Sequence, residues 1–215
     1  MIYQIPKDFC QFYIVRHGET TFNKRNIIQG HSDINLTTEA IKKTRELGRK
    51  LKNISFSATF CSNLIRARKT AEIIQSKKSL IISSKLIKDR RMGILEGRKA
   101  STLNREQKRL LNLSGKTDES NILKANKIES IDELCQRLNY FFNKTTLAYK
   151  NKRVLVITHA GIIGRLIINA KYKGAKSFED LKIANLSYLI LNSNGVEYQI
   201  AGVNNIDIIS NHSST

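Results

Sequence analysis

The fold is decided by residues 12–23, which read Phe-Tyr-Ile-Val-Arg-His-Gly-Glu-Thr-Thr-Phe-Asn. The first four residues are an apolar run of aromatic and β-branched side chains, typical of a buried strand. The run stops at Arg16 and His17. Because ligands of an open α/β sheet bind where its parallel strands end, this pair lies where chemistry usually occurs. The alternative is an ordinary strand end with a solvated arginine and a structural histidine.

A second apolar run ends in the same way. Residues 153–158 read Arg-Val-Leu-Val-Ile-Thr and stop at His159, Ala160 and Gly161. The chain has only 4 histidines, and two of them stand at strand ends close to a glycine. If both strands belong to one parallel sheet, they end at the same edge. We therefore expect His17 and His159 to face each other.

The charge balance favours anionic partners. Lys and Arg number 37 against 18 Asp and Glu, which gives a net charge of +19. Such a charge suits a phosphorylated small molecule, nucleic acid or a membrane surface. Aromatic residues make up 7%, there is no Trp and no dense Lys/Arg tract, so we do not expect a nucleic-acid partner. A general compositional bias toward Lys, Asn and Ile explains the excess equally well.

Length and cysteine usage limit the class of protein. The 215 residues fit a single domain, and we expect a monomer or a homodimer, which an exposed edge strand would permit. Cys10, Cys61 and Cys135 lack metal-ligand spacing, which predicts free thiols in a reducing compartment. No apolar stretch reaches membrane-spanning length and none resembles a cleavable leader. These features predict a soluble, cytoplasmic protein without a metal or a membrane partner.

Strand and helix patterns alternate along the rest of the chain. This alternation predicts an α/β fold, a three-layer αβα sandwich with a mainly parallel central sheet. Arg66 begins a helix directly behind a strand, so we expect it at the same sheet edge as His17. The further predicted strands are 57–61, 79–84, and a hairpin of 186–191 with 196–200. The predicted helices are one capped by Thr37, one over 63–71, one starting at Ser130 and one over 162–167.

Two segments between the strands carry less regular signals. Asp89 lies between arginines in a glycine-punctuated loop, where a carboxylate acts either as a structural ion-pair partner or as a general acid. Residues 98–128 are basic and weakly periodic, which predicts one or two short helices. We expect this segment to be an insertion or lid that determines substrate specificity.

Several short motifs follow one another along the chain. They are Arg16-His17-Gly18-Glu19-Thr20 with Asn23, Leu36-Thr37, Ser62-Asn63-Leu64 with Arg66-Ala67 and Thr70-Ala71, Gly93 with Glu96-Gly97, and Thr158-His159-Ala160-Gly161. Each is weak alone, but together and in this order they are highly specific. From about Phe12 to about Ile209 the chain resembles the histidine phosphatase (phosphoglycerate mutase-like) superfamily.

Within that superfamily the chain looks like the phosphatases rather than the mutases. Residues 22–30 and 90–97 are similar to the fructose-2,6-bisphosphatase-like enzymes of the glycolysis and apoptosis regulator type. The resemblance therefore implies a small phosphorylated metabolite as substrate, either a fructose bisphosphate or another sugar phosphate. It also implies a phosphoric monoester hydrolase that works through a phosphohistidine, without a metal ion or other cofactor.

The resemblance implies a role for each matching residue. His17 would attack phosphorus, with its other ring nitrogen held by the Gly18 carbonyl, and His159 would assist. The phosphate ligands would be Arg16, Asn23, Arg66, His159 and Ala160, and the substrate-binding residues would be Gln29, Gly30 and Glu96. Arginine suits this task because its planar fork can hold two phosphate oxygens.

One departure from the family leaves alternatives open. The family's acid is a glutamate, and the matching position here is Asp89, which is one methylene shorter. Glu96 is the alternative acid. A phosphoglycerate mutase, which retains the phosphoryl group, is one alternative function. A catalytically weak phosphate-binding module is the other. A second departure is Ile128, because the family usually has glycine before Glu129 and Ser130. The resemblance would place Glu129 and Ser130 near the substrate, but Ser130 is explained equally well as a helix cap.

Overall fold

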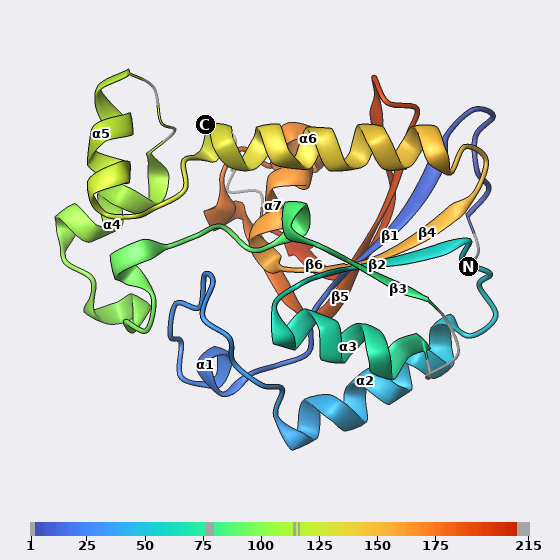
Figure 1. Ribbon diagram of the computed structural model, residues 1–215, viewed down its shortest axis with the longest axis horizontal. Coiled ribbons are helices and arrows are strands. Elements are labelled where there is room, and N and C mark those ends of the chain that lie inside the picture. Colours follow the sequence, from blue (N-terminus) through green and yellow to red (C-terminus); the bar gives the residue numbers. More distant parts are fainter. Residues whose placement is uncertain (1–2, 76–79, 114, 116, 210–215) are drawn as a thin grey trace.

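A six-stranded sheet forms the centre of the molecule (Figure 1). The structure is a computed structural model that describes residues 3–75, 80–113, 115 and 117–209. The strands run in the order β3-β2-β4-β1-β5-β6. β1 to β4 are parallel, while β5 and β6 are antiparallel at one edge, so the predicted mainly parallel sheet is confirmed. The bounds are β1 Cys10–Arg16, β2 Ala58–Ser62, β3 Ile81–Ser84, β4 Arg153–Thr158, β5 Leu181–Ser193 and β6 Tyr198–Ile208.

Helices cover both faces of the sheet and complete the three layers (Figure 1). α2 (Thr38–Leu51) and α3 (Ile65–Gln75) lie on one face, and α6 (Ile131–Ala148) and α7 (Ala160–Asn169) lie on the other. Both α2 and α6 start at a hydroxyl N-cap, Thr37 and Ser130, whose side chain accepts a backbone N–H of the first turn. The apolar sides of the two helices pack into the core, with Leu47 and Leu51 of α2 in one cluster and Leu134 and Leu138 of α6 in the other.

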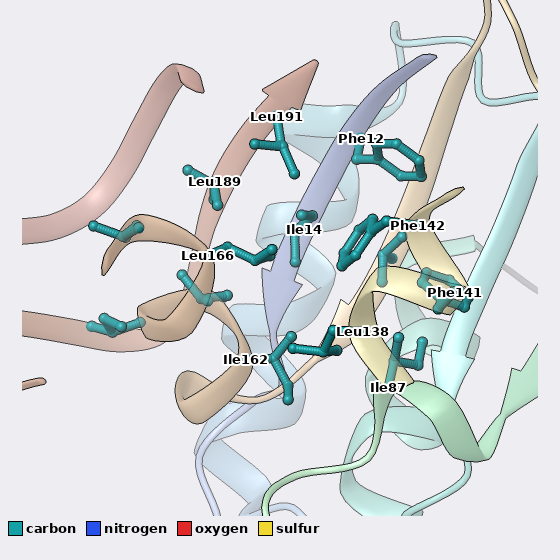
Figure 2. Close-up of a cluster of buried hydrophobic side chains, with 14 of the residues drawn as sticks. Phe12, Ile14, Ile87, Leu138, Phe141, Phe142, Ile162, Leu166, Leu189 and Leu191 are labelled. Atoms are coloured by element: carbon teal, nitrogen blue, oxygen red, sulfur yellow. The ribbon is translucent and has the colours of Figure 1, made fainter. Parts of the chain in front are cut away.

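The alternating side chains of β1 supply both halves of the core. Phe12 and Ile14 point to the α6 and α7 side, where side chains from β1, β5, α6 and α7 converge (Figure 2). Phe12 meets Phe142 edge to face, with ring centroids 5.1 Å apart. Tyr13 and Val15 point to the α2 and α3 side. β1 is therefore fixed from both faces, and the residues at its end are held rigidly.

Residues 98–128 form a small lobe beside the N-terminal end of α6 (Figure 1). The lobe contains the 3₁₀ turn Ala100–Thr102, α4 (Arg105–Asn112) and α5 (Thr117–Ala125). It has an apolar cluster of its own. Arg90 joins the lobe to the loop of residues 88–91, because its guanidinium donates to the carbonyls of Leu111, Leu113 and Glu129. The remaining short elements are α1 Thr21–Lys24 and the 3₁₀ turns Lys85–Ile87, Gly93–Leu95, Tyr172–Gly174 and Phe178–Asp180.

The two antiparallel strands at the β5–β6 edge of the sheet are longer than the sequence predicts. The predicted hairpin of 186–191 and 196–200 is in fact β5 and β6, which extend over 181–193 and 198–208. A left-handed residue, Leu186 (φ 61°), lies at a break in the pairing register between Ile183 and Tyr188. This bulge interrupts the period-two pattern by which a strand is recognised. The predicted strand start at Ser79 and the polar tail with His212 lie outside the described residues.

Candidate active site

The pairing of β1 with β4 brings the two strand-end histidines together. Arg16 lies opposite Thr158 in the parallel register, so His17 and His159 occupy the next step on neighbouring strands. Their ring centroids are 5.2 Å apart. Both side chains are buried, at 2% and 0% exposure. The edge of the sheet thus holds two neighbouring imidazoles shielded from water, as expected from the two strand ends.

Two contacts fix the tautomer of His17. Its Nδ1 lies 2.7 Å from the carbonyl oxygen of Gly18, which accepts a hydrogen bond. The Nε of Arg66 donates to Nε2 at 3.2 Å. Nδ1 must therefore carry the hydrogen, and Nε2 keeps its lone pair. Burial lowers the pKa of His17 well below its ordinary value, and the charge of Arg66 adds to the effect, so the ring is neutral.

Two guanidinium groups supply positive charge beside His17. Arg66 is fully buried, and it donates to the carbonyls of Gly30 and Ser32, both at 2.8 Å. Arg16 donates to the carbonyl of Ile183, and its buried Nε has no hydrogen-bond partner among the described residues. Burial lowers the pKa of both arginines, because removing a guanidinium group from water disfavours its charged form. An incoming anion would offset that cost.

Asn23 is oriented by two amide donors. Its Oδ1 accepts the backbone N–H of Thr20 at 3.1 Å and the side-chain amide of Asn185 at 3.3 Å. Asn185 also donates to the carbonyl of His17 at 3.0 Å. With the oxygen occupied in this way, the amide NH₂ group is the part of Asn23 available to a ligand.

His159 presents an unpaired nitrogen to the same space. Its Nε2 lies 2.8 Å from the hydroxyl of Ser62, while its buried Nδ1 has no hydrogen-bond partner among the described residues. The hydroxyl of Ser62 already accepts the N–H of Leu64 at 3.3 Å, which favours donation of its own hydrogen to Nε2. Nδ1 then carries a hydrogen. His159 and Ala160 also begin α7, whose first turn has no side-chain cap, and such N–H groups suit an anion.

Replacing Ser62 tests this orientation. We expect Ser62→Ala to lower kcat for the phosphate ester hydrolysis predicted from the sequence by about 10-fold, because the His159 tautomer is no longer fixed. The ¹⁵N shifts of the imidazole should move from an Nδ1–H pattern to a mixture of tautomers. Ser55→Ala, at an exposed position, is the matched control. Unchanged shifts in Ser62→Ala would show that the hydroxyl does not set the tautomer.

Stability should depend on pH through the same two histidines. Burial lowers the pKa of His17 and His159 well below about 6.5, the value that each has in an unfolded chain. As pH falls below about 6.5, the unfolded chain binds protons that the folded protein excludes, so stability is lost. We expect a loss of at most about 1.4 kcal/mol per pH unit for each histidine. Urea unfolding of His159→Gln should show a shallower dependence; identical slopes would contradict this account.

Asp89 faces the histidines and the buried arginine. Its Oδ2 lies 3.4 Å from Nη2 of Arg66 and 3.9 Å from Nδ1 of His159. The side chain is 22% exposed, and burial raises the pKa of its carboxyl group although Arg66 opposes this shift. A Cβ on Gly161 would lie 2.8 Å from Oδ1, so this glycine makes room for the carboxyl group. Asp89 is therefore placed to carry a proton at the site.

Arg137 of α6 holds the Asp89 segment in position. It donates to the carbonyls of Leu86, Lys88 and Asp89, at 2.6, 2.9 and 3.0 Å. Its Nε and Nη2 also pair with the carboxylate of Glu129. Glu129 thus has a structural partner, and Ser130 is the N-cap of α6 with a capping box to Glu133.

The remaining predicted substrate residues are divided between two positions. Gln29 and Gly30 line a pocket of about 660 Å³ beside Asp89. Glu96 is not among the residues lining this pocket. Its Oε1 accepts the N–H of His31 at 2.9 Å and of Met92 at 3.0 Å. Glu96 therefore supports the loop beneath Gly30, and Asp89, not Glu96, is the carboxyl group that faces the histidines.

Ser62, Arg137 and Asn185 are site residues that sequence reasoning did not assign to the chemistry. Ser62 ends a predicted strand, which was a usable signal because His17 and His159 also follow strand ends. Arg137 and Asn185 had no such signal, since they reach the site from the middle of a helix and from a bulged strand.

Within the described parts of the chain, no group of His, Cys, Asp and Glu side chains is arranged to hold a metal ion. No helix among the described residues has the length and apolar character needed to cross a membrane. The cysteines are free, with Cys10 and Cys61 buried and Cys135 half-buried.

Comparisons with known proteins identify the family. The model of the histidine phosphatase superfamily (branch 1) matches residues 12–206. "Probable phosphoglycerate mutase GpmB" of Erwinia tasmaniensis is 30% identical over 181 residues, 82% of each chain. This chain therefore belongs to the histidine phosphatase superfamily, and its relatives include phosphoglycerate mutase-like proteins.

Solved structures with the same fold include both phosphatases and mutases. A phosphoserine phosphatase mutant of Entamoeba histolytica superposes with a TM-score of 0.75 at 22% identity, covering 91% of this chain and 96% of that one. A phosphoglycerate mutase from Bacillus anthracis gives 0.74 at 21% identity, covering 92% and 93%. At this identity the likeness establishes the fold.

Proposed function

We propose that this protein is a metal-independent phosphomonoester hydrolase that acts on a small phosphorylated metabolite through a phosphohistidine at His17. The observation that carries the proposal is the lone pair of His17 Nε2, held in a buried site beside two guanidinium groups and one carboxyl group. A phosphomonoester is a dianion, and its hydrolysis is among the slowest uncatalysed reactions. A buried, positively charged site binds the dianion and stabilises the charge that develops in the transition state.

In the first step Nε2 of His17 attacks phosphorus and the bond to the leaving oxygen breaks. The N–H of Arg66 that faces Nε2 then turns to a phosphate oxygen. Arg16, the amide of Asn23 and Nδ1 of His159 hold the other oxygens as charge develops. The N–H groups of the first turn of α7, beginning at Ala160, add donors.

Asp89 is the residue that donates and accepts the proton in the two steps. In protonated form it donates to the leaving oxygen, so the product departs as an alcohol. As a carboxylate it then takes a proton from water, which attacks phosphorus and breaks the bond to Nε2. Phosphate leaves and His17 regains its lone pair. The pKa of Asp89, raised by burial, supports the protonated form at the start of the cycle.

A phosphoglycerate mutase is the second candidate, favoured by the 30% identity to "Probable phosphoglycerate mutase GpmB". Both reactions use the same phosphohistidine. They differ in the acceptor, which is water in a phosphatase and a second hydroxyl group of phosphoglycerate in a mutase.

Phosphate release with excess chelator present tests the proposal. The panel contains fructose-2,6-bisphosphate and fructose-1,6-bisphosphate, because residues 22–30 and 90–97 resemble those of fructose-2,6-bisphosphatase-like enzymes. It also contains other sugar phosphates, aryl phosphates and phosphoglycerates. We expect release that is absent in His17→Ala. Movement of phosphate between positions of phosphoglycerate, without release, would indicate the mutase. Vanadate binding without either reaction would indicate a phosphate-binding module.

A further inference from the structure

The pocket beside Asp89 is larger than a short metabolite needs. Its volume is about 660 Å³, and it opens onto Asp89 and Gly161. Pockets of this size usually enclose most of a medium-sized organic ligand. The organic part of a substrate whose phosphate sits on His17 would extend into this space, between α4, the N-terminal turns of α6, α7 and the 3₁₀ turn Phe178–Asp180.

Apolar side chains make up much of the pocket wall. Most of them are only half-buried, and Phe178 is 47% exposed. Covering such surface with a ligand is favourable, at about 25 cal/mol per Å². Hydroxyl groups of a sugar that lay against these apolar side chains would lack hydrogen-bond partners. Six of these apolar residues are Ile28, Leu111, Ile131, Leu134, Ile168 and Phe178.

Arg165 adds a free positive charge to one wall. Its Nε is buried and has no hydrogen-bond partner, and among the described residues no carboxylate lies within 4.0 Å of its guanidinium group. Lys108 and Lys176 also line the pocket and add positive charge, while Glu179 lines it with a negative charge. Arg90 differs from Arg165, because its guanidinium is engaged by backbone carbonyls.

The position of Arg165 sets where a second anionic group would sit. Gly161 and Arg165 are four residues apart on α7, and side chains with this spacing lie on one face, about 5–6 Å apart at Cβ. A Cβ added at Gly161 would lie 2.8 Å from Oδ1 of Asp89, so this end of α7 is next to the carboxyl group. The second anion would therefore lie about one helical turn from the point where the leaving oxygen is protonated.

We infer that the pocket selects an amphipathic phosphomonoester, with an aromatic or aliphatic body against the apolar wall and a second anionic group, a carboxylate or a phosphate, bound by Arg165. This inference rests on the proposed phosphatase function and narrows its substrate class. It favours an apolar body over the sugar phosphates that the sequence resemblance suggests.

Matched substrates separate the parts of the inference. Phenyl phosphate carries the body alone, para-carboxyphenyl phosphate adds the carboxylate, para-phenylene bisphosphate adds a phosphate, and glucose phosphate carries hydroxyl groups. We expect kcat/KM to be highest for one of the two anionic aryl esters and lowest for the sugar ester. The anionic ester with the higher kcat/KM shows whether the second anionic group is a carboxylate or a phosphate. A preference for the sugar ester would overturn the inference.

Variants test the role assigned to Arg165. Arg165→Gln should lower kcat/KM for the preferred anionic ester by about 10- to 100-fold and change phenyl phosphate less than about 3-fold. Arg165→Lys, which keeps the charge, should recover part of the loss. Arg49→Gln, at an exposed position on α2, is the matched control. Equal losses on both esters, or no loss, would contradict the assignment.

A binding arm keeps this test independent of turnover. Calorimetry with para-carboxyphenylphosphonate and phenylphosphonate, which cannot be hydrolysed, measures binding to the pocket without turnover. We expect the carboxylate to tighten binding in the wild type but not in Arg165→Gln. If no ester is hydrolysed but this difference is found, the proposed hydrolase fails and the pocket assignment stands. If neither phosphonate binds, the pocket assignment fails as well.

Discussion

His17→Ala should abolish phosphate release, with a loss of at least about 10,000-fold in kcat on every hydrolysed ester. The expectation follows from geometry, since the Nε2 lone pair of His17 is the nucleophile in the account and no second residue of the site can replace it. Asp89 is a weaker nucleophile, and His159 is the phosphate-binding partner. Phosphate release measured with chelator present gives the result directly.

The loss in His17→Ala must be separated from loss of the fold. His17 is buried, so truncation leaves a cavity and lowers stability. His17→Asn keeps more of the volume and a group able to donate to the Gly18 carbonyl. Both variants should bind vanadate, because Arg16 and Arg66 remain. A folded His17→Asn that retained wild-type turnover would remove His17 from the role of nucleophile.

Asp89→Asn should lower turnover of an alkyl phosphate by about 100- to 10,000-fold, the usual contribution of a general acid. An amide cannot deliver a proton to the departing alkoxide. The loss of kcat/KM on para-nitrophenyl phosphate should be far smaller, because that leaving group departs without a proton. The measurement is kcat/KM on both esters, because this quantity reports phosphoryl transfer to His17 and excludes the later hydrolysis, in which Asp89 acts as the base for either ester.

The pH profile gives a second reading of Asp89. Burial raises the pKa of its carboxyl group, and the protonated form is the active one, so turnover of the alkyl ester should fall as pH rises through that pKa. The activated ester should lack this alkaline limb. Asp207→Asn, at an exposed carboxylate on β6, is the control. Equal losses of kcat/KM on both esters would exclude the acid role of Asp89 in the first step.

Much of the fold could be predicted because its signals are local. The apolar run of β1 and the hydroxyl caps Thr37 and Ser130 depend on neighbouring residues in the sequence. The meeting of His17 with His159 depends only on the rule that parallel strands end at one edge. The order of the motifs identified the family, which the family model confirms.

Other features depend on contacts between distant segments and left no pattern to read. The bulge at Leu186 hid the start of β5. Arg137 reaches the Asp89 segment from a helix 48 residues further along the chain. The pocket joins residues from six separate parts of the sequence, so its chemistry appears only when the lobe of residues 98–128 is folded against α6 and α7.

Trapping the phosphoenzyme tests the central claim most directly. The enzyme is mixed with a hydrolysed ester, quenched within one turnover in alkali, where phosphohistidine survives, and digested for mass spectrometry. We predict one phosphoryl group on His17 of the wild type and none at this position in His17→Asn. Phosphate release with no phosphorylated His17 at any time in the turnover, or with a phosphoryl group on another residue, would contradict the account.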